Sequence, residues 1–261
     1  MKIGFIGAGN MGTALATAAS RADGVSLYVS DINKTKCKEL SAATGANISD
    51  TETIARECDM IFLAVKPQHI GDVVRAIAPY TDNAVIVSMA AGVTILTIEE
   101  HLGKAMPIIR IMPNTPVSVG RGMILAARNA QVTDGMLSDF LRVLKHAGDI
   151  DVIDERLIDA GTAVSGCSPA FVYMFIEALA DGGVTAGLPR DKAQLYAAKT
   201  LIGAASLLLE SGKHPGELKD AVCSPGGSTI EGVRALEEGA MRGIVSGAVV
   251  ASYEKTKALG K

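Results

Sequence analysis

The chain has 261 residues and a formal net charge of −3 at pH 7, with 48% hydrophobic and 20% charged residues. This balance is typical of a folded globular protein rather than a disordered one, and the length suffices for one large domain or two modest ones. The slight negative charge, the aromatic content of 4% and the lack of tryptophan argue against nucleic acid or an anionic membrane as a partner.

The four cysteines lie far apart, without a CxxC pair or a nearby pair of histidines. This spacing argues against a metal site and a disulfide framework, and it suits a reducing cytosol. The apolar run at residues 1–6 is too short for a signal peptide. Later apolar stretches, such as residues 201–209, fall short of the roughly 20 residues that span a bilayer. We therefore expect a cytoplasmic protein without a membrane segment.

A glycine-rich motif follows the first predicted strand, residues 2–6, and precedes an alanine-rich helix predicted at 13–20. The order of strand, G-x-G-x-x-G turn and helix is what gives this motif its meaning. The first glycine permits the tight turn, the second lets the backbone approach a pyrophosphate, and the third lets the helix pack on the strand. We expect a dinucleotide site here, rather than a merely structural turn, formed by Gly7, Ala8, Gly9, Asn10, Met11 and Gly12.

A second strand is predicted at residues 25–29, and Asp31 follows it, 19 residues past Gly12. An acid at this place commonly accepts hydrogen bonds from the adenine-side ribose, which favours NADH because a 2′-phosphate would meet a carboxylate. Asn33, Lys34 and Lys36 come next and offer a place for that phosphate. Asp31 is also compatible with capping the helix predicted at 34–44. The sequence thus leaves NADPH or NADH as the cofactor.

Strands at 60–65, 84–89, 108–111, 122–127 and 150–153 alternate with helices at 70–78, 97–102 and 133–146. This alternation predicts a doubly wound, Rossmann-type parallel sheet in a domain spanning 1–155. Ligands bind at the carboxyl ends of such strands. There we expect the cofactor residues Ala64, Val65, Lys66, Pro67, Ala90, Ala91 and Gly92, with Asn114 nearby. Lys66 also suits a solvated charge at a strand end, but we favour the cofactor side.

Strand signals end after residue 155, so we predict an all-helical domain at 156–261. Its helices are expected at 156–187, kinked at Ser165–Pro169, and at 190–211, 215–222, 230–238 and 241–259. Apolar residues on more than one helix face are more than one layer can hide. We infer a homodimer formed through this half; the alternative is a self-contained bundle that packs on the sheet.

The loop at residues 224–229, sequence SPGGST, lies between two of these helices. Small hydroxyl residues, two glycines and a proline at a helix start suit an anion site, because backbone N–H groups and the positive end of the helix dipole point at the ligand. An ordinary turn with Ser228 or Thr229 as N-cap is the alternative.

Several segments together resemble pyrroline-5-carboxylate reductases, over essentially the full length and in the same order. These are AVKP at 64–67, AAGVT at 90–94, MPNTP at 112–116, VSGCSPA at 164–170, ADGG at 180–183, GLPR at 187–190, HPG at 214–216 and, most specifically, LKDAVCSPGGSTI at 218–230. Asp31 departs from the family, where serine, threonine or asparagine is more common, which puts NADPH preference in doubt.

The resemblance implies an enzyme of proline biosynthesis that reduces the cyclic imine 1-pyrroline-5-carboxylate to L-proline with NAD(P)H. It also implies a helical dimerisation domain and dimers that often assemble into rings. On this basis we assign the substrate carboxylate to the loop, at Ser224, Gly226, Gly227, Ser228 and Thr229. Thr229 is the catalytic candidate, contacting the ring nitrogen. Asn114 and Ser165 are candidate neighbours of nicotinamide and substrate, and a structural cap or turn role suits each equally well.

Two other classes of protein are alternatives to a reductase. A 3-hydroxyacid dehydrogenase shares the first motif but needs a lysine base behind a glycine-rich helical segment, and neither Lys192 nor Lys199 has one. A regulatory protein that binds NAD(P) would not need the loop at 224–229.

Overall fold

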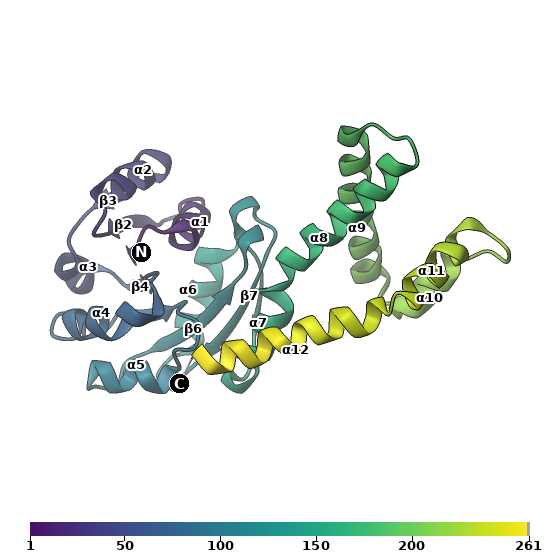
Figure 1. Cartoon of the computed structure of the whole chain (residues 1–261). Helices are drawn as coiled ribbons and strands as arrows, with labels where there is room; N and C mark the ends of the chain where they lie inside the picture. The colour runs from purple at the N-terminus through teal and green to yellow at the C-terminus, as the bar shows by residue number, and fades with distance from the viewer. Residues whose placement is uncertain (260–261) are drawn as a thin grey trace. The chain divides into compact units, whose positions relative to one another are not determined.

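Eight strands form one sheet in the computed structural model, which describes residues 1–259 (Figure 1). The spatial order is β3-β2-β1-β4-β5-β6-β7-β8, and every neighbouring pair is parallel except β6 and β7. The strand bounds are β1 Lys2–Ile6, β2 Ser26–Ser30, β3 Asn47–Ile48, β4 Met60–Leu63, β5 Val85–Ser88, β6 Ile108–Pro113, β7 Gly122–Arg128 and β8 Gly148–Val152. The order reverses between β1 and β4, which is where a doubly wound sheet opens its ligand crevice.

Helices cover both faces of the sheet, so each face has its own apolar core. One core includes residues of α1 (Asn10–Ala19), α2 (Lys34–Thr44) and α6 (Asp134–Leu144). The other includes residues of α3 (Thr51–Glu57), α4 (Ile70–Ile77), α5 (Ile95–Leu102) and α7 (Ile158–Ser165). Three short 3-10 helices complete this part: η1 Pro67–His69, η2 Thr115–Val119 and η3 Glu155–Leu157.

The central strands show why these residues form a sheet covered on both sides. All four residues of β4 are buried, which confirms the expectation from its continuous apolar run. Phe5 of β1 and Phe62 of β4 stand side by side in register, with ring centroids 4.6 Å apart. This stacked pair fixes the two strands whose carboxyl ends carry Gly7 and Ala64.

The doubly wound, Rossmann-type sheet domain is confirmed, with differences in detail. The sheet is not wholly parallel, since β7 runs antiparallel to β6. The short strand β3 and helix α3 were not predicted. Helix α1 begins at Asn10 rather than residue 13. Asp31 does not cap α2: the side chain of Asn33 accepts hydrogen bonds from the N–H groups of Thr35 and Lys36 instead.

The remaining helices are α8 Ser168–Thr185, α9 Arg190–Ser211, α10 Pro215–Val222, α11 Ser228–Glu238 and α12 Met241–Leu259. The chain divides into a unit of Met1–Cys167 with the chain end from Ser252, and a unit of Ser168–Ala251. The single kinked helix predicted at 156–187 is instead broken into η3, α7 and α8. Gly166 ends α7, and Pro169 sits in the first turn of α8, where its missing N–H costs nothing.

The helical unit has almost no core of its own. Within residues 168–251, all of which the structure describes, only Ala180, Ala193 and Ala197 are buried. Large apolar side chains face outward instead: Ile202 is 62% exposed, Leu209 83% and Ile244 66%. A single protomer therefore leaves a broad apolar surface on these helices.

One stretch among the described residues, Glu155–Thr185, is long and apolar enough to cross a membrane by length and composition alone. It is longer than the apolar runs considered in the sequence. Its first helix, α7, belongs to the core of the sheet unit, because Ile158 and Ala163 are fully buried. A Cβ added at Gly161 would lie 2.3 Å from Cδ1 of Leu125 on β7. Helix α7 is therefore packed as a core helix, whereas 11% of the most apolar window of the whole stretch is buried.

Candidate functional site

The turn after β1 is built so tightly that two of its three motif glycines are required by packing. Gly7 has a φ of +110°, and a Cβ added there would lie 2.5 Å from the carbonyl oxygen of Ala64. A Cβ at Gly12 would lie 2.5 Å from the carbonyl oxygen of Gly7. Gly9 differs, because a Cβ there would meet nothing within 4 Å. The space above Gly9 is open.

Gly9 is also the N-cap residue of α1, and no side chain caps this helix. The first N–H groups of a helix lack partners within it, and together with the helix dipole they favour an anion. An open space beside an uncapped helix N-terminus is what the pyrophosphate of a dinucleotide requires. The residues present therefore fit a dinucleotide.

A cleft of about 830 Å³ lies at the carboxyl ends of β1, β2 and β4. Of the residues expected at the cofactor, it is lined by Gly7, Gly9, Asp31, Ala64, Val65 and Lys66. Its lining does not include Ala8, Asn10, Met11, Gly12, Pro67, Ala90, Ala91 or Gly92. It does include Asp50 and Thr51 at the start of α3, which sequence reasoning missed because no motif marks that short helix.

Asp31 braces the glycine turn from the side of the cleft. Its Oδ2 accepts a hydrogen bond from the N–H of Ala8 at 2.6 Å, and its Oδ1 accepts one from the N–H of Asn33 at 2.8 Å. The carboxylate thereby ties the loop after β2 to the loop after β1. Lys34 and Lys36 line the same cleft, so both signs of charge meet where the chain leaves β2.

Asn114 and Ser165 are brought together by the fold, in structural roles. The Asn114 amide donates from Nδ2 to the carbonyl oxygen of Ser165 at 3.0 Å, and its Oδ1 accepts from the N–H of Met123 at 2.9 Å. The Ser165 hydroxyl donates to the carbonyl oxygen of Gly161 at 3.0 Å. These bonds hold the last turn of α7 against the end of β6.

The loop at Ser224–Gly227 forms a tight turn between α10 and α11 in the helical unit. Gly226 has a φ of +67°, and the N–H of Gly227 donates to the carbonyl oxygen of Ser224 at 3.0 Å. The N-cap of α11 is Gly227, without a side-chain cap, so Ser228 and Thr229 are not caps, contrary to the simpler alternative. Within this loop, which the structure describes fully, the hydroxyls of Ser224, Ser228 and Thr229 make no hydrogen bond to the protomer.

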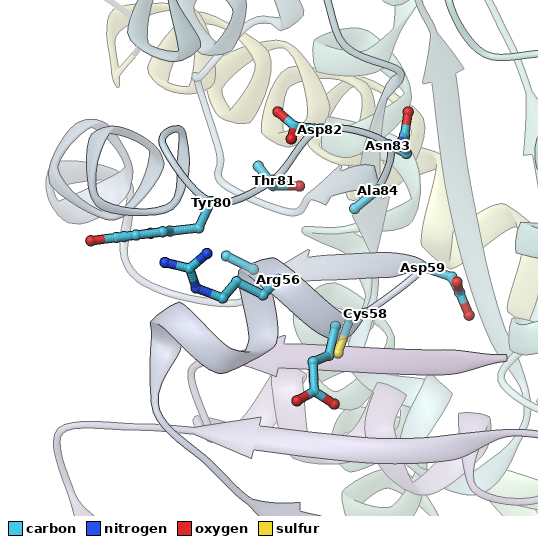
Figure 2. A pocket seen from close by; sticks show the side chains of 10 residues that line it. Arg56, Cys58, Asp59, Tyr80, Thr81, Asp82, Asn83 and Ala84 are labelled. Atoms are coloured by element: carbon cyan, nitrogen blue, oxygen red, sulfur yellow. The ribbon is translucent and has the colours of Figure 1, made fainter.

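A second pocket, of about 240 Å³, lies at the amino ends of β4 and β5. Figure 2 shows the Arg56 guanidinium beside the ring of Tyr80, 4.4 Å from the ring centroid. Burial, with a smaller contribution from the charge of Asp59, raises the pKa of the Cys58 thiol to about 12. The thiol is therefore protonated at neutral pH and a poor nucleophile. This pocket lies at the opposite ends of the strands from the glycine turn.

Residues 1–259 contain no group of three or more His, Cys, Asp or Glu side chains that could hold a metal ion.

Two family models match the chain. One, described as pyrroline-5-carboxylate reductase dimerisation, matches residues 155–259. The other, described as NADP oxidoreductase coenzyme F420-dependent, matches residues 2–92. Together they cover parts of both the sheet and the helical half.

Several full-length relatives are pyrroline-5-carboxylate reductases. The pyrroline-5-carboxylate reductase of Escherichia coli (strain K12) is 41% identical over 268 residues, which cover 100% of this chain and 98% of that protein. The crystal structure of Plasmodium falciparum pyrroline carboxylate reductase with NADP bound is similar with a TM-score of 0.89 at 36% identity, covering 100% of this chain and 98% of that one. A pyrroline-5-carboxylate reductase from Coxiella burnetii gives a TM-score of 0.91 at 30% identity, covering 99% and 98%. This chain therefore belongs to the pyrroline-5-carboxylate reductase family.

Proposed function

We propose that this protein reduces 1-pyrroline-5-carboxylate to L-proline, the last step of proline biosynthesis. The observation that carries the proposal is the full-length identity of 41% to a reductase of that name. NAD(P)H, when bound, would supply a hydride for the carbon of the protonated imine, whose nitrogen already carries its proton and so becomes a neutral amine. The protein's task is to hold both partners and to align them, because a protonated imine is already electrophilic.

The cofactor is held by the cleft at the glycine turn. The open space at Gly9 and the uncapped start of α1 receive the pyrophosphate. Asp31 and Lys66 flank the same cleft. Ala8, Asn10 to Gly12, Pro67 and the loop at Ala90–Gly92 complete the proposed set through backbone position, since they follow the carboxyl ends of β1, β4 and β5.

The substrate carboxylate is held by the N–H groups of Gly226, Ser228 and Thr229 and by the hydroxyl of Ser224. Gly227, whose N–H donates to the carbonyl oxygen of Ser224, belongs to the site as the residue that closes the turn. The support for this is the second glycine-capped helix N-terminus, that of α11, with its unbonded hydroxyls. Thr229 contacts the ring nitrogen. Because a threonine hydroxyl is a poor acid, we assign it to orientation of the ring rather than to proton donation. Asn114 and Ser165 belong to the proposed site as neighbours that shape it.

The direct test follows the absorbance of the reduced cofactor with 1-pyrroline-5-carboxylate, and with simple 3-hydroxyacids and the oxidised cofactor as the comparison. Turnover of the imine alone supports the proposal. Turnover of a hydroxyacid favours a dehydrogenase. Binding of cofactor without turnover of any imine favours the regulatory alternative.

Asp31 provides a test of cofactor choice. We expect Asp31→Ser to raise the ratio of kcat/KM with NADPH to that with NADH by about tenfold, because a carboxylate repels a 2′-phosphate while Lys34 and Lys36 line the same cleft. The variant also loses the bond to the N–H of Ala8, so rates with NADH should fall. An unchanged ratio of the two rates would remove Asp31 from cofactor selection.

We further propose that the active form is a homodimer made through residues 156–261, and that dimers assemble into a ring. The exposed apolar side chains of the helical unit, residues 168–251, support this proposal. Leu209, for example, is 83% exposed in the protomer. Sedimentation velocity should give a dimer or a multiple of it at micromolar concentration. A stable monomer would contradict the proposal.

We also assign residues 1–155 to cofactor binding. We place the protein in the cytoplasm, with neither nucleic acid nor a membrane as a partner.

A further inference from the structure

A guanidinium group lies buried in the middle of the sheet. Arg110 on β6 is 2% exposed. Its strand neighbours Ile109 and Ile111 pack in the core that contains α1. Arg110 therefore projects to the other face, where Ile108 and Ile158 belong to the second core. A charge in such a place is stable only with charged partners that satisfy it.

Those partners come from η3 and α7. Helix α7 lies beside β6 and β7 (Figure 1), and η3 contacts β7. Nη1 of Arg110 donates to Oε1 of Glu155 at 3.2 Å, and Nη2 donates to Oδ1 of Asp159 at 2.8 Å. Both carboxylate side chains are 29% exposed. Glu155 opens η3, and Asp159 lies in the first turn of α7, where a negative charge is favoured. One arginine thus holds the start of both helical segments.

Glu155 has a second partner in another element. Its Oε1 also accepts a hydrogen bond from the N–H of Ile95 at 2.8 Å. Ile95 is the first residue of α5, directly after the loop at residues 90–94, of which the proposed function assigns Ala90–Gly92 to the cofactor side. The carboxylate that neutralises Arg110 therefore also fixes the far end of that loop.

The other end of α7 is held by the same strand. Asn114 follows β6, four residues after Arg110, and its amide donates to the carbonyl oxygen of Ser165 at 3.0 Å. Helix α7 is therefore fastened to the β6 segment at its start by Arg110 and at its end by Asn114. Ser165 is one of the residues that the proposed function assigns to the substrate side.

We propose that Arg110, Glu155 and Asp159 are positioning residues for the reduction: this ion cluster sets the loop at 90–94 through Glu155 and helix α7 with Ser165 through Asp159. The inference rests on the proposed function for its kinetic consequence. The two carboxylates have different roles. Glu155 positions the loop before α5, because it accepts the hydrogen bond from Ile95, whereas Asp159 positions α7, because it lies on that helix.

The test uses shape-preserving variants, because Arg110→Ala leaves two carboxylates without their cation and threatens the fold. For Glu155→Gln we expect the Kd for NADH, measured by its fluorescence, to rise about fivefold with kcat little changed, as for one weakened hydrogen-bonded contact. For Asp159→Asn we expect kcat to fall about tenfold with the Kd for NADH unchanged, as remote misplacement of a reacting group produces.

The matched control is Asp134→Asn. It removes the ion pair between Arg128 of the adjacent strand β7 and Asp134, whose side chain is 94% exposed. It should change neither Kd nor kcat. The proposal is overturned if Glu155→Gln and Asp159→Asn move Kd and kcat together, or move them no more than the control does, even where both variants melt at a lower temperature. The Kd measurement needs no imine, so it tests the Glu155 arm even if turnover of 1-pyrroline-5-carboxylate fails and the proposed function with it.

Discussion

Replacing Gly9 with valine should leave the protein folded and nearly abolish dinucleotide binding. A side chain at Gly9 meets nothing within 4 Å in the protein, and the φ of −74° suits any L-residue. The branched side chain would instead fill the space that the pyrophosphate needs. We expect the Kd for NADH to rise by about 100-fold or more, roughly 2.7 kcal/mol, measured by fluorescence titration.

Two comparisons make this prediction specific. Gly135→Val places the same side chain at an exposed turn of α6, where the nearest atom, the Thr133 hydroxyl oxygen, is 3.8 Å from the added Cβ. The Gly135→Val variant should bind NADH with the same Kd as the unchanged protein. Gly7→Ala should damage the fold instead, because its φ is +110° and its Cβ would lie 2.5 Å from a backbone oxygen. Since valine is a poorer N-cap than glycine, Gly9→Val should cost about 1 kcal/mol of stability. Normal NADH affinity in Gly9→Val would show that the pyrophosphate lies elsewhere.

The sheet was predictable where the sequence pattern reflects burial directly. The four residues of β4 are apolar because both faces are covered, and the glycine turn follows β1 because strand, turn and helix must pass close together there. The direction of β7 was not predictable, since the apolar run at residues 123–127 has the same pattern in either orientation. The two-residue strand β3 is too short to carry a pattern at all.

The helix caps were the weakest part of the sequence reasoning, and their correction bears on function. Asp31, Ser228 and Thr229 are all residue types that favour the N-cap position. The N-cap residues are nevertheless Asn33 for α2 and Gly227 for α11. Composition cannot decide this, because capping depends on the φ and ψ of a single residue. The structure also reveals a shared feature: α1 and α11, the helices at the two proposed anion sites, both begin at a glycine without a side-chain cap.

Helix α11 carries the second large prediction, the loss of activity in Thr229→Ala. Thr229 is exposed on the first turn of α11, and alanine is the better helix former, so stability should not suffer. If the hydroxyl holds the ring nitrogen of the imine, its removal should lower kcat/KM for 1-pyrroline-5-carboxylate by about 10- to 100-fold, the loss of roughly 1–3 kcal/mol expected for one such contact. Steady-state kinetics at fixed cofactor concentration measures it.

The controls separate orientation from other roles of this residue. Thr229→Ser keeps the hydroxyl and should recover most of the rate. Thr200→Ala removes an exposed threonine from α9 and should be silent. The Kd for NADH should stay the same in all three variants, because the dinucleotide cleft is lined by residues of the sheet unit. Full activity in Thr229→Ala would exclude the hydroxyl from the site. A loss that Thr229→Ser does not recover would mean that the methyl group, through packing, matters more than the hydrogen bond.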